Sequence, residues 1–217
     1  MSDELDLRSA EGFVQPDVKA EFPGLRLSWI TIEARPAASP PELARRLEAL
    51  SNRYRGASVV AMRTKPIPQA FRVFFRHIGL DPDVTRIPSE EAAVARLLHG
   101  EFRSSGQIPD ACLVALIETG VPVWALDADV VDAGGLGIRT ATASDLAAAG
   151  ARELRLSPGS LTVADRSKVH APLFGDPVPG RRVHSDTRRI ALYALGVDGV
   201  PAIHVEEALW TCLEALR

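Results

Sequence analysis

Apolar segments with two different periodicities follow one another along this chain, and their order is the feature that most limits its fold. Helical apolar stripes come first, short strand-like segments separated by Gly, Pro and Ser come next, and one amphipathic helix closes the chain. The strand-like segments cover residues 124–127, 136–141, 161–165 and 189–195. This order predicts an α+β domain with a mixed or antiparallel sheet at its core and helices on its flanks.

The first part of the chain is expected to supply two strands and two helices. Residues 1–20 show no periodicity, so we expect a flexible or loosely docked arm there. Residues 25–32 alternate as a strand does, residues 41–54 carry a leucine stripe typical of a helix, and residues 58–62 favour a second short strand. A further helix with an apolar stripe is expected over residues 66–79.

Three more helices are indicated by their end signals or by their periodicity. Ser89 is placed to cap the first of them. Residues 110–119 form an apolar helical segment that Gly120 and Pro122 should stop. Residues 205–216 carry their apolar residues on one helical face, so the chain should end in a packed helix.

The size of the chain favours one domain. At 217 residues and 46% hydrophobic content it can bury one sizeable core, and we expect residues 21–217 to form a single module. The sequence GGLG at residues 134–137 lacks the strand-to-helix context of a phosphate-binding loop. We therefore expect a turn that enters a strand there, and no nucleotide cofactor.

The two cysteines do not indicate a metal site. Cys112 and Cys212 lie in apolar helical patterns, without a Cys-x-x-Cys motif or clustered histidines, so two buried thiols are expected and no metal ion. No stretch approaches the roughly 18 apolar residues that span a membrane, so no membrane partner is expected. The acidic N-terminus has no apolar signal region, which favours a cytoplasmic protein.

Charge is distributed unevenly along the chain. The net charge is −3, yet residues 139–189 hold nine Arg or Lys against five Asp or Glu. A local positive excess of this kind is typical either of a phosphate-binding face or of an ordinary solvated surface. The sequence leaves both interpretations open.

Four segments in the second half carry a resemblance to a known family. They read IETGVPVWALDADVVDAGG over residues 117–135, RTATASD over 139–145, LTVAD over 161–165 and RRVHSDTRRIAL over 181–192. Their order and spacing resemble the tRNA-editing (B-three/B-four) domain of the bacterial phenylalanyl-tRNA synthetase beta subunit, whose pattern reads LELGQPxHAFDxDxxxG, RxAxxGE, LVIAD and SEVxxxT.

The resemblance extends over residues 66–198. The stretch RIPSEEA, which begins at Arg86, matches the Arg-x-Pro-Ser-x-Glu-Ala of free-standing members of the family. The resemblance implies a free-standing editing-domain type of fold, with tRNA or aminoacyl-tRNA as the partner. It also implies hydrolysis of mischarged aminoacyl-tRNA, an aminoacyl-tRNA deacylase activity, without an obligatory cofactor, metal or covalent nucleophile.

The chain departs from the family pattern at several positions, among them Ser144-Asp145 in place of Gly-Glu and Leu113 near the family's asparagine, and two departures fall in the pocket. Trp124 stands where the family has a pocket-lining His, and Arg182 aligns with the Glu that reads the tyrosine hydroxyl of a mischarged tRNA. Trp124 is either a stacking surface in a pocket or a core residue. These departures keep open the alternative of a non-catalytic module that binds RNA or a small amino-acid-like ligand. The oligomeric state stays open.

Two sets of candidate site residues follow from the resemblance and from the charge distribution. Arg86 is placed either at a helix cap or facing a cleft, and Arg139 and Asp165 form either a structural pair or part of the cleft. The candidate pocket residues are Trp124, Asp127, Arg139, Asp165, Thr187, Arg86 and Glu90. The candidate tRNA-binding residues are Arg181, Arg182, Arg188 and Arg189.

Overall fold

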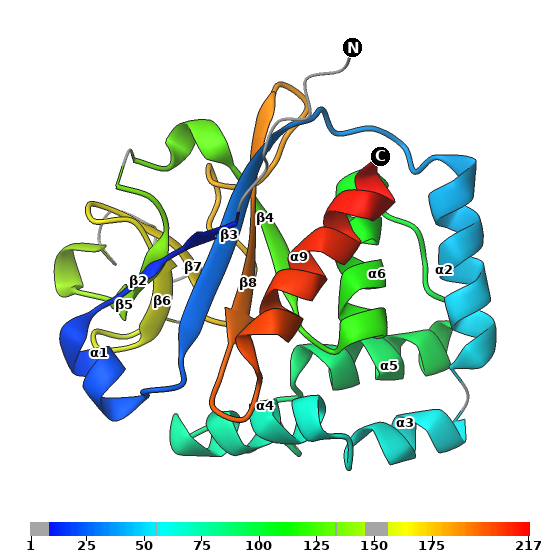
Figure 1. Cartoon of the computed structure of the whole chain (residues 1–217), viewed down its shortest axis with the longest axis horizontal. Coiled ribbons are helices and arrows are strands. Elements are labelled where there is room, and N and C mark those ends of the chain that lie inside the picture. The colour runs from blue at the N-terminus through cyan, green and yellow to red at the C-terminus, as the bar shows by residue number, and fades with distance from the viewer. Residues whose placement is uncertain (1–8, 55, 133, 146–155) are drawn as a thin grey trace.

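Two four-stranded sheets and a group of helices form three layers in a computed structural model that describes residues 9–54, 56–132, 134–145 and 156–217. The first sheet lies between the helices on one side and the second sheet on the other (Figure 1). The α+β single-domain fold with sheets flanked by helices is the fold class expected from the sequence.

The first sheet is antiparallel throughout. Its strand order is β1 (Ala10–Glu11), β3 (Arg26–Glu33), β8 (Arg189–Gly196) and β4 (Val123–Asp127). Residues 190–195 of β8 are fully buried because the strand is covered on both faces. This explains why the segment reads as a continuous apolar run rather than an alternating one.

The second sheet is mixed. Its order is β2 (Phe13–Val14), β5 (Gly137–Thr140), β6 (Leu161–Ala164) and β7 (Val169–Pro172). The pair β2–β5 is parallel and the other two pairs are antiparallel. The turn predicted at residues 134–137 is present, with Gly135 at a φ of 75° just before β5.

The helix layer packs on the opposite face of the first sheet, as Figure 1 shows. It contains α2 (Pro41–Arg53), α3 (Gly56–Met62), α4 (Pro66–His77), α5 (Pro88–His99), α6 (Gln107–Thr119) and α9 (Ala202–Leu216). Helix α6 is enclosed by its neighbours α2, α5 and α9 and by β4, which fits its apolar sequence. The predicted stop is confirmed, because Gly120 caps α6 in the left-handed conformation at φ 78°.

The N-terminal segment corrects one expectation. A flexible or loosely docked arm was predicted over residues 1–20. The structure instead forms β1 in the first sheet, β2 in the second sheet, and then α1 (Pro16–Glu21). Gly12 joins the two strands where space is short, since a Cβ atom there would meet the Leu136 carbonyl oxygen at 2.6 Å and Leu27 Cδ2 at 2.7 Å. Strands of two residues are too short to show a periodicity. Residues 1–8 lie outside the described residues.

Two other local expectations were wrong. Residues 58–62 belong to helix α3 rather than to a strand. Ser89 does not cap α5, because the helix starts at Pro88 with Ile87 at the N-cap position, and the buried Ser89 hydroxyl makes no hydrogen bond to the described residues. Proline at the first helical position pre-sets the backbone, which fixes the helix start one residue before the serine.

Candidate functional site

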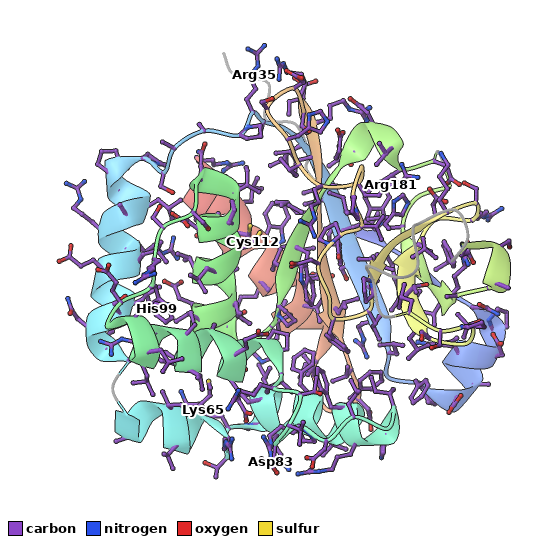
Figure 2. All side chains as sticks on the ribbon, turned by 180° about the vertical axis from the view of Figure 1, so that it is seen from behind. Arg35, Lys65, Asp83, His99, Cys112 and Arg181 are labelled. Carbon is purple, nitrogen blue, oxygen red and sulfur yellow. The ribbon has the colours of Figure 1, made fainter. Side chains whose placement is uncertain are left out.

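A cavity of about 510 Å³ opens beside Trp124. Four segments wall it: β4, the first turn of α6, the stretch leading to α2, and residues 176–183. Cys112 on α6, labelled in Figure 2, lines it together with Trp124. A volume of this size is within the range of small-ligand pockets.

Trp124 forms a wall of this cavity. Its half-buried indole stacks on Tyr193 of the neighbouring strand, with ring centroids 5.5 Å apart and an interplanar angle of 17°. The Phe174 ring lies on the indole as well, with a centroid-to-centroid distance of 6.2 Å. The stack follows from strand register, since β4 and β8 place Trp124 directly opposite Tyr193. The indole therefore packs on the core with one side and borders the cavity with another.

Two charged side chains line the same cavity without an ionic partner. Arg182 Nε donates to the Pro177 carbonyl oxygen at 2.8 Å, which holds the guanidinium in place. Within the described residues, the terminal nitrogens of Arg182 and the carboxylate of Asp176 have neither a hydrogen bond nor an ion pair. Both groups are thus available to a ligand.

A buried carboxylate next to the cavity lining joins two of its walls. Asp110, in the first turn of α6, accepts hydrogen bonds from the hydroxyls of Ser39 and Ser104 and from the Ser105 N–H at 2.9 Å. These bonds tie the stretch before α2 and the stretch before α6 to one point. Two of the cavity walls are therefore held rigidly together.

Asp127 and Thr187 hold the loop that carries Arg182, but they do not line the cavity. Asp127 Oδ2 accepts from Thr187 Oγ1 at 3.0 Å and lies 3.1 Å from His184 Nε2, while the Asp127 N–H donates to the Arg181 carbonyl oxygen at 3.1 Å. These bonds attach residues 181–187 to the end of β4. These two candidate pocket residues therefore position the loop that carries Arg182.

Arg139 and Asp165 lie on the second sheet, away from the Trp124 cavity. Arg139 binds Asp145 through two hydrogen bonds of 2.7 and 2.8 Å, which lower the pKa of the Asp145 carboxyl, and it reaches only the backbone oxygen of Asp165, at 3.2 Å. The sequence left open whether Arg139 faces the Asp165 carboxylate. The geometry shows that its ionic partner is Asp145.

The Asp165 carboxylate is fully buried and saturated with donors. It accepts from the N–H groups of Ser167 (2.8 Å), Lys168 (2.6 Å) and Asp132 (3.2 Å), from the Ser167 hydroxyl (2.9 Å) and from His170 Nε2 (2.8 Å). Burial opposes its ionisation, but the bonds from Ser167, His170 and Lys168 outweigh that effect and lower the pKa of Asp165 to about 2.

His170 is a buried partner that sequence reasoning missed. Because the ionised Asp165 can only accept, His170 Nε2 carries the proton, and Nδ1 is a buried nitrogen without a partner among the described residues. Burial lowers the pKa of His170, against the raising effect of Asp165. In the sequence, only the short separation of Asp165 and His170 in ADRSKVHAP indicates that their side chains could meet.

Arg86 and Glu90 are separated by the structure. Arg86 is exposed and lines a second, larger cleft of about 760 Å³ between α1, α4 and the second sheet. Glu90 instead points into the protein, where it binds Arg72 Nη1 at 2.8 and 3.0 Å and lies 3.5 Å from Arg63. Of the seven candidate pocket residues, Trp124 alone lines the cavity that also contains Arg182.

The remaining candidate tRNA-binding arginines lie at one end of the first sheet. Arg188 and Arg189 line a shallow hollow with Arg35 and Glu33, and Figure 2 shows Arg35 and Arg181 at the same end of the molecule. Arg189 forms an ion pair with Asp129 at 3.0 Å, and Arg188 donates to the Ser185 and Thr187 carbonyl oxygens. Arg181 is half-buried, with Nε unpaired within the described chain.

The two cysteines meet at the interface of α6 and α9. Their sulfur atoms are 3.9 Å apart, Cys212 is fully buried and Cys112 is partly exposed to the cavity. The hydrogen bond with Cys112 and burial together raise the pKa of the Cys212 thiol.

The part of the chain that the structure describes contains no cluster of three or more metal-ligating side chains, and none of its helices is long and apolar enough to cross a membrane. No protein-family model and no curated protein sequence matches this chain.

Proposed function

We propose that this protein is a free-standing relative of the phenylalanyl-tRNA synthetase editing domain that binds aminoacyl-tRNA, with the aminoacyl end in the Trp124 cavity. One observation carries the proposal. The resemblance assigns pocket roles to Trp124 and Arg182, which lie in segments far apart in the sequence, and both residues line the same cavity. The two positions at which the family pocket is replaced thus meet at one cavity, as a shared pocket requires.

The arginine end of the first sheet is the proposed contact for the tRNA backbone. Arg188 ends the loop that carries Arg182, Arg189 begins β8, and Arg35 adds a third guanidinium at their hollow. Guanidinium groups suit phosphate because they donate in a planar fork. The hollow adjoins the cavity along the chain, since Arg35 lines the hollow and Pro36 lines the cavity. Such a protein would work in the cytoplasm with the translation machinery.

Hydrolysis, where it occurs, would depend on positioned water. The cavity holds a thiol, Cys112, but the neighbour of this thiol is the protonated Cys212 rather than a base. An aminoacyl ester is already activated, so orienting a water molecule against it is enough for catalysis.

A deacylation and binding panel tests the proposal. Purified protein is mixed with a range of aminoacyl-tRNAs and with uncharged tRNA, and both affinity and ester loss are measured. We expect at least one aminoacyl-tRNA to bind more tightly than uncharged tRNA, and we expect Arg182→Ala to reduce that preference. Arg45→Ala is the matched control, because Arg45 is an exposed arginine on α2 outside the cavity.

Equal affinity for charged and uncharged tRNA, together with ester loss at the buffer rate, would refute the proposal. The alternative, a non-catalytic module, is favoured by the replacement of two family pocket residues by Trp124 and Arg182. It predicts a preference for aminoacyl-tRNA without ester loss.

A further inference from the structure

Asp176 and Arg182 present opposite, unpaired charges to one cavity. Both residues line it, and Arg182 is anchored through Nε to the carbonyl oxygen of Pro177, the residue next to Asp176. Although they are close in the chain, they form no ion pair with each other. An anchored guanidinium and a carboxylate that has no ionic partner within the described residues are complementary to a ligand that carries an anion and a cation at separate points.

A buried aromatic side chain holds the indole that walls the cavity. The Tyr193 ring stacks on Trp124, and its fully buried hydroxyl has no hydrogen-bond partner within the described residues. Burial, then the charges of Cys112 and Asp176, raise the pKa of Tyr193, so the group stays a neutral donor. Tyr193 is not among the residues that line the cavity, so it supports the indole from the core side and is not a contact for the ligand.

We infer that Asp176 binds the protonated α-amino group of the aminoacyl ligand. This inference rests on the proposed function and names the group that the cavity selects. An aminoacyl ester has a free ammonium group and no carboxylate, so the anion that Arg182 takes is the phosphate next to the terminal nucleoside. The indole of Trp124 contacts the amino-acid side chain. The ligand class is thus an aminoacyl ester with an unblocked α-amino group, and N-acylated esters are rejected.

Charge explains the selectivity. A carboxylate beside an amine favours its protonated form and accepts a charge-assisted hydrogen bond from it. N-acetylation removes the positive charge and leaves Asp176 facing a neutral amide. Asp176→Asn removes the negative charge while keeping nearly the same shape, and Asp176 is exposed, so the variant should fold as the parent does.

The test compares matched probes by equilibrium binding. Alanyl-, valyl- and phenylalanyl-tRNA are compared with their N-acetyl derivatives and with uncharged tRNA. We expect the free α-amino form of the best-bound probe to bind about tenfold more tightly than its N-acetyl form, as one charge-assisted hydrogen bond supports. In Asp176→Asn this ratio should fall to about one. Asp186→Asn, which changes an exposed aspartate outside the cavity lining, should keep the ratio of the wild type.

The outcomes separate the inference from the function. A preference for aminoacyl-tRNA over uncharged tRNA, with N-acetyl forms bound equally well, overturns the role of Asp176 and leaves the proposed function standing. No preference for any aminoacyl-tRNA overturns both. Valine methyl ester is the small probe with a free ammonium group. If it binds as tightly as valyl-tRNA and Asp176→Asn weakens both, the cavity binds a small amine rather than a tRNA.

Discussion

The Trp124 cavity and the Asp165 centre both contain carboxylates near arginine, yet they treat those charges in opposite ways. Asp165 receives five hydrogen bonds from the protein itself and has no capacity left for a ligand. Asp176 and Arg182 line a cavity and have no ionic partner in the part of the chain that the structure describes. A saturated charge stabilises the fold, whereas an unpaired charge at a cavity is available for binding.

Loss of the saturated centre should have the largest effect. Asp165→Ala leaves several buried donors unpaired, so we expect the free energy of unfolding to fall by about 3–5 kcal/mol, measured by urea denaturation. Asp176→Ala is the counterpart in the cavity and should change stability by less than about 0.5 kcal/mol. Similar losses in the two variants would remove the distinction between the two regions.

Acid should weaken the Asp165 centre in two steps. The pKa of His170 is lowered below 6.5, so the unfolded state binds an extra proton first and stability falls as the pH drops below about 6.5. The pKa of Asp165 is lowered from 3.8 to about 2, so its contribution is present above about pH 4 and is lost between about pH 4 and 2.

The first step can be assigned by mutation. Urea denaturation from about pH 7.5 to 5 should show a falling stability for the wild type, and His170→Gln, which cannot be protonated, should flatten that slope. An unchanged slope in His170→Gln would mean that another group titrates there.

Charge reversal at the arginine end should weaken tRNA binding moderately. Arg188→Glu combined with Arg189→Glu replaces two exposed cations at the hollow, so we expect an affinity loss of about tenfold and a shallower dependence on salt. The control is Arg45→Glu combined with Arg76→Glu in the helix layer, which changes net charge equally. Equal losses in both pairs would show that overall charge decides binding and that the hollow is an ordinary solvated surface.

Removal of the indole should produce the smallest change, a shift in ligand range. Trp124→Ala enlarges the cavity, so larger aminoacyl groups should gain affinity relative to alanyl-tRNA by a few-fold, measured by competition binding. Trp210→Ala is the matched control, since Trp210 is partly exposed on α9 and lies outside the cavity lining. An identical ranking of ligands in both variants would show that the indole does not limit the cavity.

Segments with a strong periodicity of their own were predictable from sequence. The helices α2, α4, α6 and α9 formed where apolar stripes and Gly or Pro stops indicated them. Helix α3 was missed because its Val59–Val60 pair favours a strand locally, yet a strand needs a partner and this segment packs against α5. Strand β7 was missed because the sequence VHAP has no alternation and forms only by pairing with β6.

The candidate site was predictable only in part. Trp124 and Arg182 were identified through the resemblance, and the cavity joins them. Asp176 carried no signal because an aspartate between Gly and Pro is typical of a turn. Asp165 was assigned to the pocket because it ends a strand, and only the three-dimensional structure shows that Ser167, Lys168 and His170 satisfy it.

The pairing of β3 with β8 also determines when the protein can fold during synthesis. The register places Ile30 opposite Leu192, so an early segment of the chain must wait for a partner that is synthesised much later. Until then, β3 has an apolar face and an unpaired edge exposed to other molecules. We therefore expect nascent chains truncated before β8 to be sensitive to proteases, and folding to be slow because its central contact is distant in sequence.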